Sequence, residues 1–164
     1  REEYRDKIAL LREVVPDIAI TSDIIVGFPG ETKKDFQQTA FMIEDIQFDD
    51  LFIFHYTDRA GTKASQFPDS VPYPVKIERL KVLNEMQKKI SLEKNKKLIN
   101  TVVSVLFEEP SKKGLGTLAG RTRSNKVVNS KASNKLLGTI HDVLIEKANI
   151  HSLAGSLQPQ ELPV

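Results

Sequence analysis

The 164-residue sequence contains no cysteine, and this absence excludes several kinds of chemistry at once. A chain without thiols forms no disulfide, offers no thiolate nucleophile and supplies no cysteine ligand to a metal or an iron–sulfur cluster. Histidine is also scarce. The three histidines (His55, His141 and His151) lie far apart and have no partner at metal-ligand spacing. We therefore expect no metal site and predict packed or surface roles for these side chains.

Long apolar runs are missing as well. No run approaches the roughly 18 residues that predict a transmembrane helix. The first ten residues, REEYRDKIAL, are charged, lack a signal-peptide pattern and do not begin with methionine. With 40% hydrophobic and 28% charged residues, the composition is that of a globular protein. We expect the chain to start within a longer cytoplasmic protein that does not contact a membrane.

Charge is distributed unevenly along the chain. Residues 1–58 hold 13 acidic and 6 basic side chains, a balance of −7, and the remainder holds 9 acidic and 18 basic, a balance of +9. Such a split predicts two units with different partners, the second of which faces an anion.

The first half alternates between helical and strand patterns. Apolar residues at helical spacing predict a helix over residues 1–15, which Pro16 ends. The run IAITSDIIVGF predicts a buried strand, residues 32–47 predict an amphipathic helix, and LFIFHYT predicts the next strand. Thr32 and Asp35 have the spacing of a capping box at the start of the second helix. This order is typical of an α/β fold with a parallel sheet.

The second half has a different pattern of predicted secondary structure. The proline-containing segment 59–74 predicts a loop, and residues 75–98 predict one long helix. From Asn100 onward, short β-prone runs alternate with Gly and Asn: TVVSVLFEE, LGTLAG, KVVN, LLGTIHDVLIEKA and IHSLAGSL. Four or five such strands in about 60 residues predict a small closed barrel of the oligonucleotide-binding sort.

The segment GFPGET stands where the first predicted strand ends. Ligands of parallel α/β sheets bind beyond the carboxyl ends of the strands. Gly27 and Gly30 allow close approach of the backbone or a positive φ, and Glu31 is a hydrogen-bond acceptor. The segment is therefore either a ligand loop or an ordinary strand-to-helix turn.

The segment HYTDRAGT follows the second predicted strand and falls on the same rim. Tyr56 offers an aromatic face and a hydroxyl, and Arg59 offers a guanidinium suited to phosphate or carboxylate. The alternative is a plain surface turn closed by Gly61.

A basic stretch runs from Ser111 to Lys135 without any Asp or Glu. Its positive residues are Lys112, Lys113, Arg121, Arg123, Lys126, Lys131 and Lys135. On an extended segment Arg121, Arg123 and Asn125 would point to the same side, an arrangement suited to a sugar–phosphate backbone with an amide for a base edge. Such a stretch is either an RNA-binding surface or solvated charge.

Three segments together resemble a known family. SDIIVGFPGET, FHYTDRAGTKAS about 30 residues later, and GLGTLAGRTRSNKVVN are similar, in order and spacing, to the C-terminal half of the radical S-adenosylmethionine methylthiotransferases. The sequence departs from the family's commoner pattern at Thr57, Ala60 and Ser130.

The resemblance implies the fold class: α/β, the C-terminal part of a partial TIM-like radical S-adenosylmethionine barrel, followed by a small antiparallel TRAM β-barrel. It implies barrel residues 1–70, a connecting helix 71–98, a TRAM domain 99–158 and a tail 159–164. The family's S-adenosylmethionine and two 4Fe–4S clusters would be cofactors of the full-length enzyme. With no cysteine in this chain, we expect the cluster ligands upstream, no metal or catalytic residue here, and no activity from this piece alone.

The resemblance also implies which residues bind ligands. Those expected to form one wall of the S-adenosylmethionine site are Ile25, Gly27, Glu31, Phe54 and Tyr56. Those expected to contact RNA are Arg59, Lys112, Lys113, Arg121, Arg123, Asn125 and Lys126.

The most similar branch of the family adds a methylthio group to C2 of N6-isopentenyladenosine at tRNA position 37. The expected partner is thus a tRNA anticodon stem-loop, bound by a monomeric full-length enzyme. Two sister activities stay open, on threonylcarbamoyladenosine in tRNA and on an aspartate of a ribosomal protein. A non-catalytic RNA-binding TRAM module is the alternative from another class.

Overall fold

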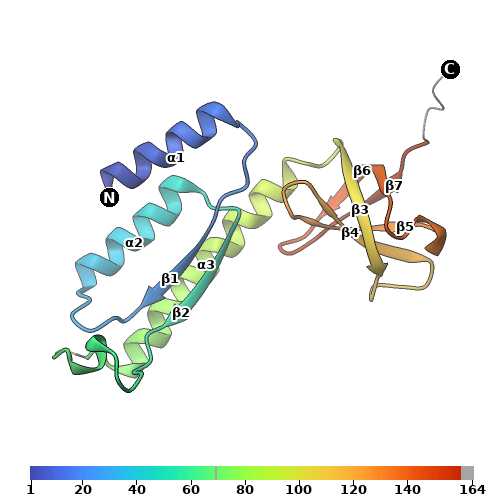
Figure 1. Ribbon diagram of the computed structural model, residues 1–164. Helices are drawn as coiled ribbons and strands as arrows, with labels where there is room; N and C mark the ends of the chain where they lie inside the picture. Colours follow the sequence, from blue (N-terminus) through green and yellow to red (C-terminus); the bar gives the residue numbers. More distant parts are fainter. Residues whose placement is uncertain (69, 160–164) are drawn as a thin grey trace. The chain divides into compact units, whose positions relative to one another are not determined.

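The computed structural model describes residues 1–68 and 70–159 and divides into two compact units, Arg1–Ile90 and Ser91–Val164 (Figure 1). Each has its own hydrophobic core. The long helix α3 (Tyr73–Lys96) begins in the first unit and ends in the second.

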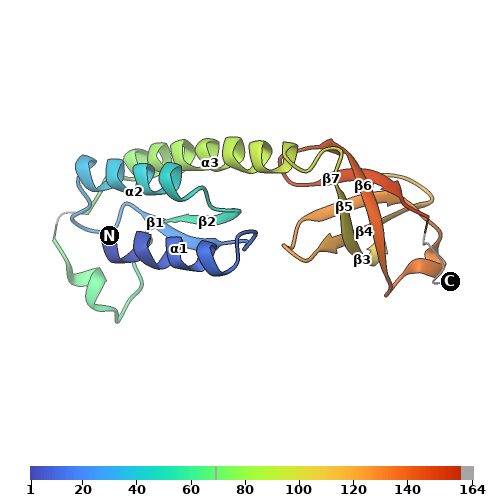
Figure 2. The ribbon, with the colours of Figure 1, turned by 90° about the horizontal axis from the view of Figure 1, so that it is seen from above.

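The first unit alternates helices and strands, in agreement with the predicted α/β pattern. Its elements before α3 are α1 (Glu2–Val14), β1 (Thr21–Val26), α2 (Lys33–Ile46), β2 (Asp50–His55) and the short 3-10 helix η1 (Lys63–Gln66). The two strands pair in parallel, with Ile25 opposite Phe54. Helices α2 and α3 lie over the same face of this sheet (Figure 2).

The two faces of the sheet differ in burial because side chains alternate along a strand. Ile24, Val26, Leu51 and Ile53 belong to the face that packs in the core. The buried core of this unit comprises Ile8, Ile20, Val26, Ile43, Ile46, Phe48, Leu51, Leu83 and Ile90. On the other face Ile25, Phe52 and Phe54 are 56%, 56% and 54% exposed, so this face is apolar and uncovered in the chain as it stands.

The predicted loop 59–74 is shorter than expected. It contains η1, and α3 begins at Tyr73, so that Pro74 lies in the first turn of the helix. Proline is tolerated there because the first N–H groups of a helix have no intrahelical acceptor. The boundary at Pro74 was therefore wrong by two residues.

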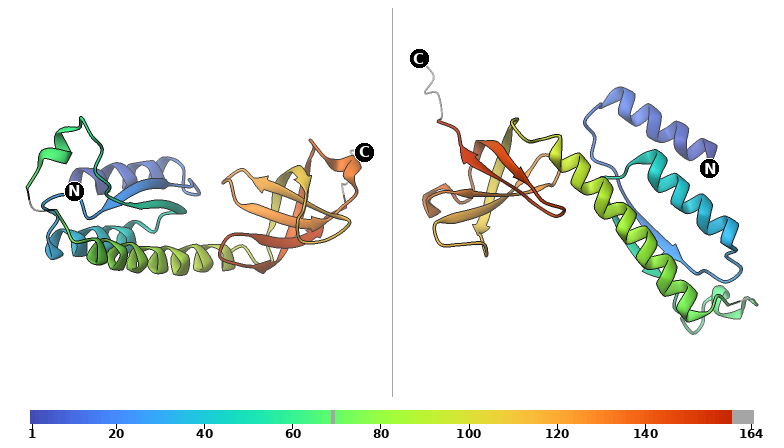
Figure 3. Two further views of the ribbon diagram at one scale, coloured as in Figure 1. Left: turned by 90° about the horizontal axis from the view of Figure 1, so that it is seen from below. Right: turned by 180° about the vertical axis from the view of Figure 1, so that it is seen from behind.

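The second unit is a closed five-stranded barrel (Figure 3). Its elements are β3 (Val102–Pro110), β4 (Thr117–Thr122), β5 (Val127–Lys131), the 3-10 helix η2 (Asn134–Leu136), β6 (Ile140–Ala148) and β7 (Leu153–Leu157). The strand order around the barrel is β3-β4-β5-β7-β6. Its buried core comprises Val105, Phe107, Leu118, Val128, Val143, Ile145 and Leu153.

One strand pair of the barrel corrects the expectation of a purely antiparallel sheet. β5 and β7 pair in parallel, and the other pairings are antiparallel. Strand direction cannot alternate all the way around a closed ring with an odd number of strands, so closing five strands requires a parallel pair.

The barrel also requires a glycine at one crowded point. A Cβ on Gly155 of β7 would overlap the carbonyl oxygen of Leu144 on the neighbouring strand β6. The register of the β6–β7 pair shifts between Ile145 and Lys147, which bends the strand at the same place. Within the described residues, no helix has the length and apolar character needed to cross a membrane.

Candidate functional site

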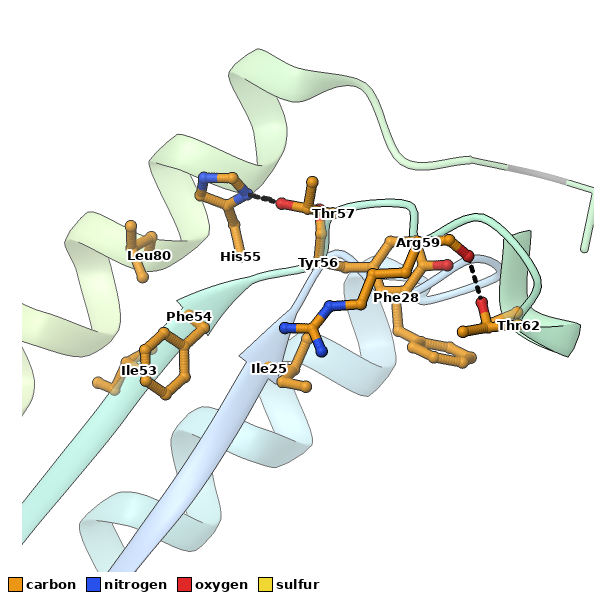
Figure 4. A pocket seen from close by; sticks show the side chains of 11 residues that line it. Ile25, Phe28, Ile53, Phe54, His55, Tyr56, Thr57, Arg59, Thr62 and Leu80 are labelled. Atoms are coloured by element: carbon orange, nitrogen blue, oxygen red, sulfur yellow. Dashed lines mark hydrogen bonds between the residues drawn. The ribbon is translucent and has the colours of Figure 1, made fainter.

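A pocket of about 700 Å³ lies in the first unit, around the carboxyl ends of β1 and β2 (Figure 4). Phe28 from the end of β1 and Tyr56 from the end of β2 meet edge to face, with ring centroids 5.1 Å apart. The lining residues are Ile25, Phe28, Ile53, Phe54, His55, Tyr56, Thr57, Arg59, Thr62, Ala64 and Leu80. The pocket is thus mostly apolar, with a few polar groups at its rim.

Three of the five residues predicted for the cofactor wall line this pocket: Ile25, Phe54 and Tyr56. Gly27 lies at the end of β1 with a φ of +71°, a conformation that other residues rarely adopt. A Cβ at this position would overlap the side chain of Lys76 from α3. The glycine is therefore required by its own backbone and by a neighbouring helix.

Glu31 has partners within the protein. Its carboxylate accepts hydrogen bonds from the backbone N–H groups of Gly27 and Phe28, the second at 3.2 Å. It also pairs with Arg79 of α3 at 3.1 Å, and the two side chains are only 12% and 10% exposed. The structure thus gives Glu31 a direct role in shaping the GFPGET loop.

Tyr56 combines a ring in the pocket with a buried hydroxyl. Among the described residues this hydroxyl has no hydrogen-bond partner of ordinary geometry. Burial raises the pKa of the Tyr56 phenol, and the nearby Asp58 carboxylate raises it further. The phenol therefore stays protonated at neutral pH and can donate a hydrogen bond.

Polar groups continue along the rim beyond Tyr56. Arg59 is exposed, and Figure 4 shows its guanidinium directed toward Ile25. His55 lies within 3.4 Å of the Thr57 hydroxyl through Nδ1. Arg59 belongs to the first unit, and the other residues predicted to contact RNA belong to the second.

The basic barrel residues predicted to contact RNA form two groups at opposite ends of β4. Lys112 and Lys113 precede the strand in the β3–β4 loop, and Arg123 and Lys126 follow it in the β4–β5 turn. A strand from residue 117 to 122 is roughly 17 Å long at 3.3 Å per residue. The structure therefore separates the predicted RNA contacts into two clusters.

Lys112 and Lys113 differ in their surroundings. Lys112 is exposed, with no interaction described for its ammonium group. Lys113 donates through Nζ to the Ser152 hydroxyl at 2.8 Å, and its backbone N–H donates to Ser111 Oγ at 3.1 Å. Ser111 Oγ in turn donates to Asn129 Oδ1 at 2.6 Å. This network fixes the start of the β3–β4 loop. Of the two lysines, Lys112 is the one whose ammonium group has no described partner that would compete with a phosphate.

The β4–β5 turn corrects the expectation that Arg121, Arg123 and Asn125 alternate along an extended segment. Arg121 lies within β4, but residues 123–126 form a turn in which Asn125 has a φ of +61°. Asparagine tolerates this left-handed conformation better than most residues, so the turn overrides the strand pattern. Asn125 Oδ1 accepts a hydrogen bond from Arg121 at 2.9 Å.

The charged side chains at this turn differ in whether they have partners within the protein. Arg121 pairs with Glu108 at 3.3 Å, and Lys126 donates to Asn95 Oδ1 at 2.9 Å. Asn95 also donates to the carbonyls of Asn149 and Ile150, which ties the last turn of α3 to the barrel. Arg123 is exposed, and no partner is described for its guanidinium.

Lys76 and Arg79 of α3 contact the candidate site but were not predicted. Both lie within a highly charged helix, where a cation usually belongs to a solvated face. A signal was present in their spacing of three residues, which places them on one side of the helix. Across the described part of the chain, no group of three metal-ligating side chains gathers into a metal site.

The closed five-stranded barrel with basic loops is an architecture that many nucleic-acid-binding proteins share. Residues 96–157, which contain the barrel, match the model of the TRAM domain family.

The chain as a whole is similar to a particular group of enzymes. It is 47% identical over 158 residues, 96% of its length, to the tRNA-2-methylthio-N(6)-dimethylallyladenosine synthase of Syntrophobacter fumaroxidans. It is 43% identical over 99% of its length to the synthase of the same name from Syntrophus aciditrophicus, and 45% identical over 96% to that of Thermoanaerobacter pseudethanolicus.

The match covers 35%, 35% and 33% of these three relatives, so the chain spans about a third of their length. The part matched is their C-terminal part. The resemblance seen in the three motifs is confirmed by these identities over nearly the whole chain.

Proposed function

We propose that this chain is the C-terminal part of a cytoplasmic tRNA methylthiotransferase. The full-length enzyme would replace the hydrogen at C2 of N6-isopentenyladenosine 37 with a methylthio group. The observation that carries the proposal is the 43–47% identity to synthases of this name, which extends through both units. In this proposal the first unit contributes part of the cofactor site, and the TRAM barrel binds the anticodon stem-loop of a tRNA. The full-length enzyme would act as a monomer.

The described pocket fits one side of an S-adenosylmethionine site. It lies at the carboxyl ends of parallel strands, where ligands of such sheets bind. When bound, S-adenosylmethionine and the two 4Fe–4S clusters would supply the radical and methyl-transfer chemistry. Ile25 and Phe54 would contact the ligand's apolar surface, Tyr56 would offer a ring and a hydroxyl, and Gly27 and Glu31 would shape the loop beneath it.

The cluster ligands would come from outside this chain, which has no cysteine. The chain alone is expected to take up no cluster and to have no methylthiotransferase activity.

A full-length protein carrying this chain tests the proposed activity. It should convert isopentenylated tRNA to the methylthio form, detected by mass spectrometry of nucleosides, with unmodified tRNA as control. Modification of threonylcarbamoyladenosine, or of a ribosomal protein aspartate, would assign the chain to a sister activity. RNA binding without any methylthiolation would support a non-catalytic module.

The tRNA contact has its own test in the salt dependence of binding. Five charge contacts from Lys112, Lys113, Arg121, Arg123 and Lys126 would give a log–log slope of roughly −3.5, at about −0.7 per phosphate on single-stranded RNA. Arg123→Ala should flatten the slope by about 0.7, since this guanidinium has no described partner to compete with phosphate. Lys147→Ala is the matched control, because Lys147 lies outside the acid-free stretch.

Asn125 is proposed to read a base edge, and it requires a different variant. Asn125→Gly keeps the left-handed backbone and removes the amide, together with the hydrogen bond that this amide accepts from Arg121. Affinity for the cognate stem-loop should fall with the salt slope unchanged, because an amide releases no counterion. Identical salt plots for wild type, Arg123→Ala and Asn125→Gly would contradict the assignment of these contacts.

A further inference from the structure

Two basic side chains of α3 contact the backbone at the carboxyl ends of β1 and β2. Lys76 and Arg79 are three residues apart, so they project from the same side of the helix. Arg79 contacts the loop after β1, and Lys76 contacts the segment after β2. Neither side chain lines the pocket itself.

Arg79 holds the GFPGET loop through Glu31. Its Nη1 lies 3.1 Å from Glu31 Oε1 and donates to the Glu31 carbonyl oxygen, also at 3.1 Å. The same Glu31 carboxylate accepts the N–H groups of Gly27 and Phe28. A continuous chain of contacts therefore runs from α3 to the backbone at the end of β1. Both charges are nearly buried, so removing either partner would leave an uncompensated charge.

Lys76 holds the end of β2. Its Nζ donates to the Tyr56 carbonyl oxygen at 3.1 Å and lies 5.1 Å from the centroid of the Tyr56 ring. Its aliphatic stem occupies the space where a Cβ of Gly27 would be. The Tyr56 N–H donates to Val26 O at 2.8 Å, which joins the two strand ends. Lys76 thus touches both segments that border the pocket.

We propose that Lys76 and Arg79 are positioning residues that set the backbone of Gly27 and Tyr56 for binding S-adenosylmethionine. This inference rests on the proposed function. A methionine would fill the space of the Lys76 stem equally well, so packing alone does not require an ammonium group. What the ammonium adds is a charge-assisted hydrogen bond to the Tyr56 carbonyl, which fixes the orientation of the peptide that carries the pocket's aromatic ring.

Lys76→Met in the full-length protein is the direct test. Affinity for S-adenosylmethionine, measured by equilibrium dialysis on the cluster-loaded protein, should fall about tenfold, the equivalent of one charged hydrogen bond of about 1.4 kcal/mol. Lys81→Met is the matched control: it makes the same change on the same helix at an exposed position with no described contact to either loop. Thermal unfolding of both variants checks that the loss of affinity is not a loss of folded protein.

Arg79 needs a variant that does not leave Glu31 unpaired. In the double variant Glu31→Gln with Arg79→Met, a neutral amide oxygen can still accept the Gly27 N–H. This double variant should fold but bind S-adenosylmethionine less tightly than wild type. The single variant Arg79→Lys keeps a positive charge beside Glu31 and should therefore bind more tightly than the double variant. The thermal midpoint separates a local effect on the loop from a general loss of stability.

The outcomes distinguish the inference from the proposed function. If wild type binds S-adenosylmethionine and Lys76→Met binds equally well, the positioning role is wrong and the proposed function stands. An equal loss of affinity in Lys76→Met and Lys81→Met would also overturn the positioning role. If the cluster-loaded wild type does not bind S-adenosylmethionine, the proposed function fails, and the inference fails with it.

Discussion

At the scale of single residues, Ser130 is an unusual side chain in the barrel. It lies in β5 and is only 2% exposed. Among the described residues its hydroxyl has no hydrogen-bond partner. A buried polar group without a partner lowers stability because it loses its hydrogen bonds to water and gains none in the protein.

We predict that Ser130→Ala raises the free energy of unfolding by about 1 kcal/mol. The substitution removes the unpartnered hydroxyl and leaves only a very small space. Urea unfolding followed by circular dichroism measures the change. Ser104→Ala is the matched control in another strand, where the hydroxyl donates to Asp142 Oδ1 at 2.7 Å, and it should be neutral or destabilising. If Ser130→Ala destabilises the protein as much as Ser104→Ala does, the Ser130 hydroxyl has a hydrogen-bond partner in solution and the prediction is wrong.

At the scale of the elements, side chains at both ends define helix α2. At its start Thr32 accepts the Asp35 N–H, and Asp35 accepts the Thr32 N–H at 2.9 Å, which confirms the predicted capping box. At its end Gln47 adopts a left-handed conformation, and Arg12 from α1 donates to the Ile46 carbonyl at 2.6 Å. The first cap is local in sequence, and the second depends on a neighbouring helix.

The capping box predicts a pH dependence. Hydrogen bonds from the Thr32 side chain, and then from its backbone, lower the pKa of Asp35 below its ordinary value. A lowered folded-state pKa stabilises the protein above the unfolded-state pKa, and this contribution is lost as pH falls through the folded-state pKa.

Thr32→Ala should therefore raise the pKa of Asp35 toward its ordinary value and cost about 1 kcal/mol of stability at neutral pH. The difference in the free energy of unfolding between Thr32→Ala and wild type should shrink at low pH, as the Asp35 carboxyl becomes protonated. An NMR titration of Asp35 and unfolding at several pH values measure both effects. Gln37→Ala, at an exposed position of the same helix, should leave the Asp35 titration unchanged. A Thr32→Ala variant with the wild-type titration would contradict the capping role.

At the scale of the whole molecule, the chain contains two units whose exposed surfaces differ in kind. The first leaves an apolar sheet face, with Ile25, Phe52 and Phe54, open to solvent. The second closes its strands into a ring and, among its described residues, buries seven apolar side chains in its own core. Ring closure leaves no free strand edge. The second unit therefore has the features of a domain that folds without help.

We predict that residues 91–164 fold alone. The peptide should give dispersed amide resonances in NMR and one cooperative unfolding transition, since small domains of this size can be stable by themselves. Residues 1–90 provide the comparison and should be less soluble, because their apolar sheet face stays exposed. A disordered spectrum for residues 91–164 would show that the barrel depends on the rest of the chain.

The sequence alone determined the elements with strong local signals. Apolar periodicity located the long helix, the Thr32–Asp35 spacing located a helix start, and consecutive β-prone runs indicated the barrel. These features could be predicted because they depend on residues close together in the chain. The motifs likewise carried the resemblance, since residue type and order suffice to recognise relatives.

Only the tertiary structure decided how distant residues meet. The parallel pairing of β5 with β7 follows from ring closure, a property of the whole barrel. The charged partner of Glu31 is Arg79 of α3, 48 residues away, and no local pattern links Arg79 to the loop after β1. Positive φ at Asn125 likewise replaced a predicted strand alternation with a turn. Periodicity reports which face of an element is buried, whereas the choice of partner across the core depends on packing in three dimensions.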